Sequence, residues 1–202
     1  MKLKLHYYLR GINNIIRYLF KEVPRGVEFS LRDLNTTYDG NHGYALTTKK
    51  ALKNILKGIN LDEISFLDIG SGKGGVICYA YELGVKSSTG LEYEKNLHLK
   101  AQKNIQRLKY QDKVCSLNID ARFFEEYGNF DIFFMFNPFD NAVYEEVINK
   151  ILLQTKSIKS EKYLITYGGA HTELLNKSER LELDKESTCP YRKNKIRIYK
   201  IN

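Results

Sequence analysis

From residue 64 onward, short apolar runs typical of β-strands alternate with segments whose apolar residues recur at helical spacing. The runs predicted as strands are Ile64–Ile69, Ser88–Glu92, Val114–Ile119, Asp131–Phe136, Tyr163–Tyr167 and Lys195–Ile201. The segments predicted as helices are Gly75–Leu83, Lys95–Lys109 and Ala142–Leu153. This alternation is typical of parallel βαβ units with helices on both faces of one sheet, so we expect an α/β fold.

Two further helices are predicted ahead of this alternation. The opening MKLKLHYYLRGINNIIRYLF places apolar side chains at helical spacing, and Pro24 ends that pattern. We expect this helix to cover its own domain, although its basic, amphipathic character would also permit binding to a membrane surface. A second helix is predicted around residues 52–59, with Thr47 or Thr48 as its N-cap.

The composition fits a single globular domain. The chain has 202 residues, of which 43% are hydrophobic, and this is enough for one substantial core. We assign residues 1–60 to N-terminal helices and a lid segment packed on the core, and residues 61–202 to the core itself. The net charge of +8 favours an anionic partner. Three cysteines without a CxxC pair argue against a disulfide framework or zinc site and favour a cytoplasmic setting, and no stretch is apolar enough to span a bilayer.

The stretch FLDIGSGKGG, residues 66–75, ends the first predicted strand with four glycines among six residues. A glycine turn at the carboxyl end of a parallel strand lets backbone N–H groups approach a ligand closely. A P-loop would need a glycine five residues before its Gly-Lys pair and a serine or threonine after the lysine. Leu67 and Gly74 occupy those two positions, so a P-loop is excluded.

A dinucleotide site would need the spacing G-x-G-x-x-G, followed by an acid near the end of the next strand. Gly70, Gly72 and Gly75 satisfy that spacing, and Glu92 ends the next predicted strand. A nicotinamide cofactor therefore remains open on this motif alone. Asp68, however, lies two residues before the first glycine, and the dinucleotide fingerprint does not require an acid there.

The run DIGSGKG resembles the first motif of the class I S-adenosylmethionine-dependent methyltransferases, in which an acid precedes G-x-G-x-G. The resemblance continues in order at three later strand ends, with Glu92 in GLEYE, Asp120 in LNIDA, and FNPF over residues 136–139. It covers roughly residues 44–167 and is closest to small uncharacterised bacterial members. It implies a Rossmann-like three-layer αβα sandwich, with a mostly parallel sheet and an antiparallel C-terminal edge strand.

The resemblance implies S-adenosyl-L-methionine as the cofactor and assigns residues to its amino-acid end. Asp68 would face this end, and Gly70, Gly72 and Gly74 would admit the backbone to it. Thr47 would contribute from the lid segment. The alternative is that Asp68 only caps the following helix or bonds the glycine loop.

The same resemblance assigns residues to the nucleoside end. Glu92 would accept both ribose hydroxyls, a bidentate use that suits a carboxylate. Asp120 would accept the adenine amino group, with Tyr93 and Ala121 as walls of the adenine slot. The alternative is that both acids are solvated strand ends.

The FNPF stretch is the candidate catalytic segment. In amino-methylating relatives, Asn-Pro-Pro-aromatic presents the asparagine side chain to the substrate nitrogen. Here Asn137, Pro138 and Phe139 match, but the second proline is absent and Asp140 follows. Asn137 could align an amine and Asp140 could take its proton. The alternative is a strand-to-helix turn in which Asp140 or Asn141 caps the next helix.

Two loops and the tail offer further candidates at the same edge of the sheet. In related enzymes the segment TYDGNHGYALTT folds over the methionine end, and its candidate lid residues are Tyr44, Thr47 and Thr48. The loop TYGGAHTE contributes Gly168, Gly169 and His171. Four cations in the tail could attract an anionic substrate or protect an exposed edge strand: Arg192, Lys193, Lys195 and Arg197.

We therefore predict a methyltransferase that uses S-adenosyl-L-methionine to methylate an unidentified protein, nucleic acid or small molecule, with a nitrogen nucleophile as one candidate acceptor. An NAD(P)-dependent oxidoreductase is the alternative enzyme, and it is disfavoured because little chain follows the sheet to form a substrate domain. A non-catalytic basic binding module on the same fold is the other alternative.

Overall fold

The computed structural model describes residues 11–30, 46–157, 160–168, 171–189 and 194–202. Its elements, in chain order, are η1 (Tyr18–Glu22), η2 (Val23–Arg25), α2 (Lys49–Ile55), β1 (Ser65–Ile69), α3 (Gly75–Glu82), β2 (Ser87–Glu92), α4 (Lys95–Leu108), β3 (Val114–Asn118), η3 (Ala121–Phe123), η4 (Tyr127–Asn129), β4 (Ile132–Met135), α5 (Asn141–Thr155), β5 (Lys162–Tyr167), α6 (Thr172–Asn176), β6 (Leu181–Thr188) and β7 (Lys195–Ile201). All six predicted strands are present, and their ends lie within one residue of the predicted ones.

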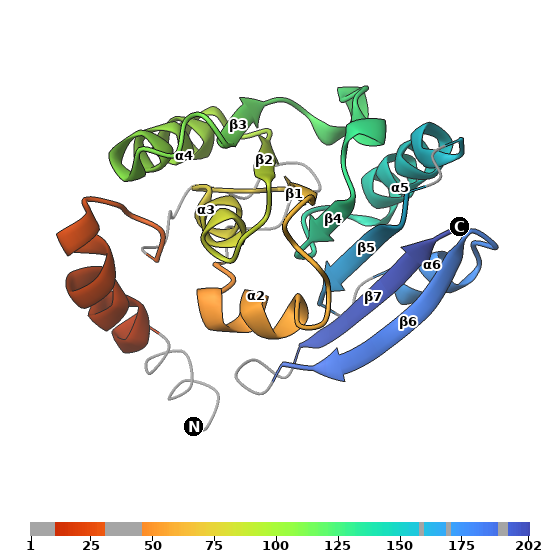
Figure 1. Ribbon diagram of the computed structural model, residues 1–202, viewed down its shortest axis with the longest axis horizontal. Helices are drawn as coiled ribbons and strands as arrows, with labels where there is room; N and C mark the ends of the chain where they lie inside the picture. The colour runs from red at the N-terminus through yellow and green to blue at the C-terminus, as the bar shows by residue number, and fades with distance from the viewer. Residues whose placement is uncertain (1–10, 31–45, 158–159, 169–170, 190–193) are drawn as a thin grey trace.

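The strands form one sheet in the order β3-β2-β1-β4-β5-β7-β6 (Figure 1). Strands β1 to β5 pair in parallel, and β7 pairs antiparallel with β5 and β6. This confirms the mostly parallel sheet with antiparallel pairing at its C-terminal end, but the C-terminal strand β7 lies between β5 and β6 and is not the edge strand that the sequence predicted. The sequence analysis missed β6, which lies outside β7. Because residues 182–188 are exposed, β6 lacks the apolar alternation by which a strand is recognised.

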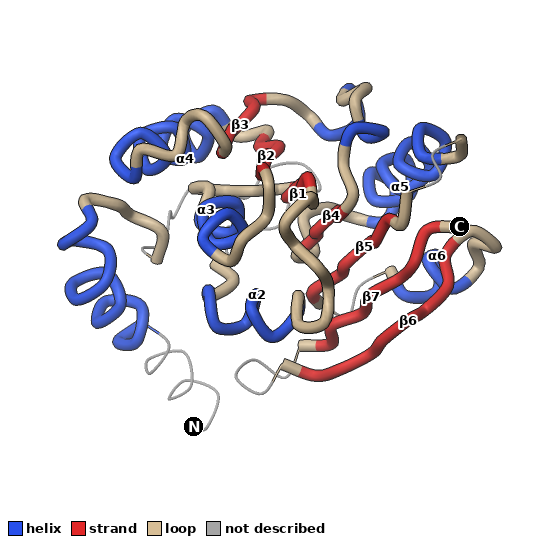
Figure 2. The backbone as a smooth tube through the Cα atoms, in the orientation of Figure 1, coloured by secondary structure: helices blue, strands red, loops and turns tan. Residues whose placement is uncertain are grey.

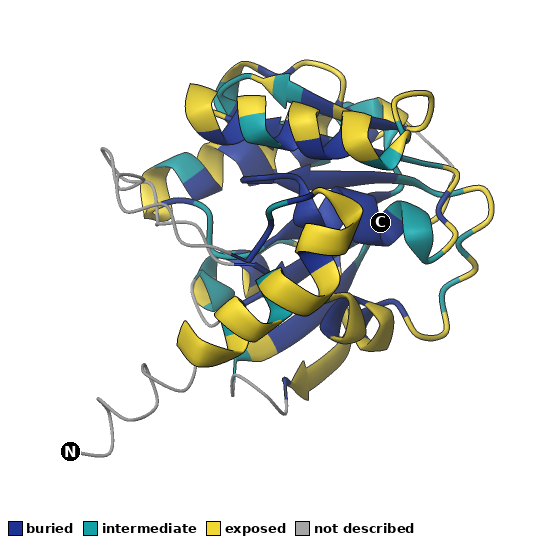
Figure 3. Cartoon of the chain, turned by 90° about the vertical axis from the view of Figure 1, so that its left-hand side faces the viewer, coloured by how far each residue is buried: buried dark blue, intermediate teal, exposed yellow. Residues whose placement is uncertain are grey.

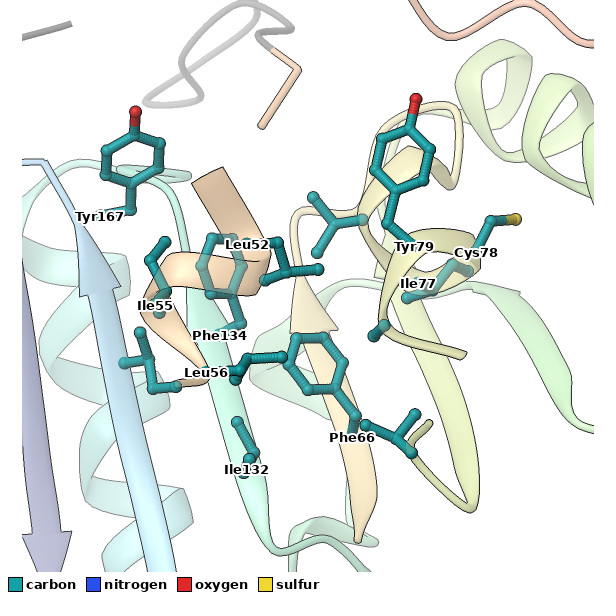
Figure 4. Packing of buried hydrophobic residues seen from close by; sticks show 14 of the residues in the cluster. Leu52, Ile55, Leu56, Phe66, Ile77, Cys78, Tyr79, Ile132, Phe134 and Tyr167 are labelled. Carbon is teal, nitrogen blue, oxygen red and sulfur yellow. The ribbon is translucent and has the colours of Figure 1, made fainter. Parts of the chain in front are cut away.

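Helices cover both faces of the sheet (Figure 2). Successive side chains of a strand point to opposite faces, so Phe66 and Phe134 enter one core while Leu67 and Phe133 enter the other. The first core joins the sheet to α2, α3 and α4, and Figure 4 shows side chains of α2 and α3 meeting those of β1 and β4. The second core joins the sheet to α5 and α6. The predicted three-layer αβα sandwich is confirmed.

The N-terminal helix, defined here as residues 11–22, is α-helical over residues 11–17 and π-helical over η1. The prediction that its apolar side covers the domain is wrong for the described residues, because these side chains are exposed (Figure 3). The helix contacts the body through Glu22, which is buried and accepts hydrogen bonds from the backbone N–H groups of Phe29 (2.7 Å) and Ser30 (2.9 Å). Among the described residues, no helix has the length and apolar character needed to cross a membrane.

Candidate active site

The glycine loop, residues 70–74, joins β1 to α3 at the carboxyl end of the parallel strands. Gly70, Gly72 and Gly74 have φ values of 84°, 56° and 77°, a region that side chains rarely adopt and glycine adopts freely. The backbone N–H groups of Gly70 and Ser71 both donate to the carbonyl of Leu91 at 2.9 Å. The spacing of the motif thus reflects the conformation that the turn requires.

Close contacts bring two other segments against Gly70 of this turn and against Gly75, the first residue of α3. A Cβ on Gly70 would lie 2.7 Å from Cβ of Pro138, in the segment between β4 and α5. A Cβ on Gly75 would lie 2.5 Å from Cδ1 of Leu46, just before α2. Two segments that the sequence assigned to the site, FNPF and the end of the lid segment, therefore pack directly against the glycine turn.

Glu92 ends β2 beside the glycine loop and is 8% exposed. One carboxylate oxygen accepts from the N–H of Gly72 at 2.7 Å, and the other from the N–H of Glu94 at 2.8 Å. Burial raises the pKa of Glu92, and the two hydrogen bonds oppose that shift. Each oxygen keeps a further lone pair for a ligand hydroxyl.

Asp68 lies one strand away from Glu92 and is 4% exposed. Burial, followed by the charge of Glu92, raises the pKa of the Asp68 carboxyl well above its usual range. Within the described part of the chain, no cation is paired with either acid. Two buried carboxylates without a cation between them are costly, and a cationic ligand would relieve that cost.

Thr47 and Thr48 have different roles, which the sequence could not separate. Thr48 is the N-cap of α2, and its Oγ1 accepts from the N–H of Ala51 at 3.2 Å. Thr47 is 1% exposed, and its Oγ1 has no hydrogen-bond partner among the described residues. The Oγ of Ser71 is also buried and unpaired, but it faces β2, since a Cβ on Gly90 would lie 2.4 Å from it. An unpaired buried hydroxyl costs about 1 to 3 kcal/mol, so Thr47 is suited to bind a ligand.

Asp120 follows β3 and is held by a residue of its own chain. Its carboxylate accepts from the backbone N–H of Arg122 at 2.9 Å and from the guanidinium of the same residue at 2.6 Å. Burial alone would raise the pKa of Asp120, but these bonds and the charge of Arg122 lower it. An adenine amino group would share this carboxylate with Arg122. Of the predicted slot walls, Ala121 is buried, and Tyr93 is 58% exposed.

Asn137 follows β4 in a left-handed conformation with φ of 41°, which few residues other than glycine, asparagine and aspartate adopt readily. Its side chain packs against Gly168 at the end of β5, where a Cβ would lie 2.2 Å from Asn137 Oδ1. Asp140 is exposed and caps α5, because its Oδ1 accepts from the N–H of Val143 at 3.2 Å. The capping alternative for Asp140 is thus present in the structure.

The other predicted residues lie farther from this arrangement or outside the described residues. His171 stacks on Tyr144 with ring centroids 4.1 Å apart, and its Nε2 lies 3.2 Å from the carbonyl oxygen of Phe139. Lys195 and Arg197 both pair with Glu186 of β6, at 2.6 and 2.7 Å. These two cations therefore share one carboxylate at the sheet edge, and a net positive charge remains there. The candidates outside the described residues are Tyr44, Gly169, Arg192 and Lys193.

A buried polar cluster beneath the glycine loop was missed by the sequence analysis. Lys73 is fully buried, and its Nζ lies 2.5 Å from Oε1 of Glu28. Asn104 of α4 donates to the carbonyl of Lys73 at 3.0 Å and accepts from the N–H of Glu28 at 3.0 Å. These residues lie 31 to 76 positions apart. No local sequence pattern predicts these contacts. The lysine within GSGKG was the one residue of the cluster that drew attention in the sequence.

Three solved structures show how this fold compares with known proteins. An RNA methyltransferase from Salinibacter ruber, in complex with S-adenosyl-L-homocysteine, is 16% identical with a TM-score of 0.63, over 78% of this chain and 94% of that one. A protein from Haemophilus influenzae that is assigned as a methylase is 26% identical with a TM-score of 0.58, and the match covers 76% of this chain and 87% of that one. TrmK from M. capricolum, in complex with S-adenosyl-homocysteine, is 15% identical with a TM-score of 0.53, over 75% and 66%.

The sheet order, the glycine loop and the acidic strand ends together define a class I S-adenosylmethionine-dependent methyltransferase. The family model described as conserved hypothetical protein 95 matches residues 46–200, and the chain belongs to this family. A search of curated proteins finds no match.

Proposed function

We propose that this methyltransferase uses Asp68, Glu92 and Thr47 to hold S-adenosyl-L-methionine and methylates a nitrogen atom of an anionic acceptor. The observation that supports the cofactor site most directly is the pair of buried carboxylates without a cation, Asp68 and Glu92. The cofactor carries an α-ammonium group and a sulfonium, and its ribose diol suits the free lone pairs of Glu92. Its carboxylate is a suitable partner for the unpaired hydroxyl of Thr47.

When bound, the cofactor supplies a methyl group on a positively charged sulfur. The chain then has to align the acceptor, exclude water and receive the proton that the acceptor nitrogen loses. Asn137 suits the first task, because Pro138 packs on the glycine loop and Gly168 leaves room for the amide beside it. Asp140 uses Oδ1 to cap α5 and retains Oδ2 as a proton acceptor. We assign Asn137 to alignment and Asp140 to proton transfer.

The class of acceptor is inferred from charge and from the departure in the FNPF stretch. The net charge of +8 favours an anionic acceptor. One structural neighbour is an RNA methyltransferase, and a nucleic acid is the anionic acceptor that we favour. The second proline of the Asn-Pro-Pro-aromatic motif is absent after Asn137, so we assign the acceptor by its nitrogen atom and its negative charge and name no particular base.

Calorimetric titrations with S-adenosylmethionine, S-adenosylhomocysteine and NAD test the cofactor assignment. We expect both sulfur ligands to bind and NAD to give no heat, and binding of NAD alone would overturn the proposal.

Asn137→Ala should bind S-adenosylhomocysteine with unchanged affinity while losing transfer of labelled methyl groups to a nucleic acid fraction. If that variant transfers label as the wild type does, Asn137 has no role in alignment.

A further inference from the structure

The N-terminal helix presents a continuous apolar stripe to solvent. The apolar residues follow the spacing i, i+3, i+4, i+7, i+8 and i+11, the pattern of one face of an α-helix, and the last of them, Val23, is the first residue of η2. Their exposed fractions are Ile12 48%, Ile15 52%, Ile16 49%, Leu19 52%, Phe20 76% and Val23 48%. Contiguous exposed apolar surface of this kind marks a site of interaction with a protein or a membrane.

The carboxyl end of the helix and the residues that follow it contact the body of the protein. These contacts determine how the helix is oriented. Glu22 binds the backbone of the following segment at Phe29 and Ser30. The guanidinium of Arg25 pairs with Glu82 of α3, and Arg107 of α4 donates to the carbonyl of Gly26. These contacts all lie at the carboxyl end of the helix and use polar groups. The apolar side chains of the stripe are therefore exposed to solvent, and Figure 3 colours most of this helix as exposed.

The charges around the stripe are almost all positive. Over residues 11–25 the cations are Arg17, Lys21 and Arg25, and the one acid, Glu22, is buried in its contact with the body. The sequence ahead of them adds further cations: Lys2, Lys4 and Arg10. A second copy of this basic helix would bring like charges together, and a nucleic acid offers little to six large apolar side chains. An apolar face flanked by Lys and Arg suits the surface of an anionic bilayer.

We propose that residues 11–23 dock the protein on anionic membrane surfaces as an interfacial helix. With about 1.5 Å of rise per residue, this segment is roughly 20 Å long, which is too short to cross a bilayer core of about 30 Å. It therefore lies in the plane of the interface, with Ile16, Leu19 and Phe20 inserted among the acyl chains. Glu28, a few residues beyond, pairs with Lys73 of the glycine loop, so the docked helix is joined directly to the candidate active site.

The test is co-sedimentation of the full chain with vesicles. One set contains phosphatidylglycerol mixed into phosphatidylcholine, and the other contains phosphatidylcholine alone. We expect binding to the anionic set, weakened by added salt, and about tenfold weaker binding to the neutral set. Failure of the wild type to sediment with anionic vesicles would overturn the proposal.

Matched variants separate the stripe from general changes in charge and hydrophobicity. Leu19→Glu should reduce binding at least about tenfold. Leu153→Glu makes the same change at a leucine of α5 that is 72% exposed, and it should bind as the wild type does. Phe20→Glu provides a second stripe variant, and thermal unfolding confirms that each variant is folded. Equal vesicle binding by Leu19→Glu and the wild type would show that the stripe does not serve a membrane.

Discussion

The side chain of Asn137 packs directly on Gly168, and a Cβ at position 168 would lie only 2.2 Å from its Oδ1. Both residues have positive φ values, 41° and 138°, at the ends of the adjacent parallel strands β4 and β5. Asparagine is one of the few residues that tolerate a left-handed conformation, and the Asn137 amide occupies the space that Gly168 leaves free. The absence of a side chain at one strand end therefore makes room for the amide at the next.

Gly168→Ala should displace the Asn137 amide and reduce methyl transfer on the order of 100-fold, because small errors in alignment are costly. The affinity for S-adenosylhomocysteine should change little, since no cofactor contact is assigned to Gly168. Transfer assays and calorimetry on the same preparation measure the two quantities. Gly84→Ala is the matched control, because Gly84 also has a left-handed φ of 110° but has no atom within 4 Å of a built Cβ. If both variants lose activity equally, backbone strain and not the contact with Asn137 is responsible.

The sequence predicted those site residues whose positions follow from secondary structure and from neighbours in the chain. Asp68, Glu92 and Asp120 could be placed because the carboxyl ends of consecutive parallel strands meet at one edge of a sheet. The contact between Asp120 and Arg122 is also local, since the two lie two positions apart, and it could have been anticipated from the run DAR. These acids were therefore within reach of sequence analysis.

Other features depend on contacts that no local pattern encodes. Glu28 contacts Lys73, which lies 45 positions away in the sequence, and Asn104, which lies 76 positions away. The outward direction of the N-terminal helix follows from where Glu22 finds its partners, whereas its amphipathic pattern alone suggested the opposite. Strand β6 was invisible because an edge strand with exposed faces needs no apolar alternation.

Asp68→Asn should stabilise the ligand-free protein at neutral pH and weaken cofactor binding. The folded-state pKa of Asp68 is raised, so the stability of the wild type falls as pH rises from about 4 through that pKa and stays low above it. Asparagine removes this loss, and a gain of about 1 kcal/mol would raise Tm by roughly 2 to 4 °C. The gain should vanish as pH falls towards 4. A variant less stable than wild type at neutral pH would contradict this account.

The same shift predicts how cofactor binding depends on pH. A cationic ligand favours the ionised form of Asp68, so the affinity of the wild type for S-adenosylmethionine should rise as pH rises through the pKa of the ligand-free protein. Calorimetry in buffers of different ionisation heat should also show proton release on binding. In Asp68→Asn the rise of affinity with pH and the proton release should both be lost. If the pH profile of that variant matches the wild type, the titration belongs to another residue.

Thr47→Val should weaken the binding of S-adenosylhomocysteine without destabilising the protein. The Oγ1 of Thr47 is buried and unpaired, so its removal loses no internal hydrogen bond. A lost hydrogen bond to the charged carboxylate of the ligand, of about 1.5 to 3 kcal/mol, corresponds to a roughly 13- to 160-fold lower affinity. Tyr144→Phe removes another buried, unpaired hydroxyl and should leave affinity unchanged. Equal affinities for both variants and wild type would exclude Thr47 from the cofactor site.

Glu92→Ala should weaken cofactor binding by roughly 1.5 to 3 kcal/mol, the usual range for hydrogen bonds to a charged group. Two effects act together, because the variant loses the acceptor for the ribose hydroxyls and also frees the N–H of Gly72 in the glycine loop. Glu94→Ala is the control at a neighbouring acid, whose side chain caps α4 by accepting from the N–H of Leu97 at 2.8 Å. Its loss should lower stability by about 1 kcal/mol and leave affinity unchanged. Calorimetry with S-adenosylhomocysteine distinguishes the two variants, and an unchanged affinity in Glu92→Ala would remove Glu92 from the site.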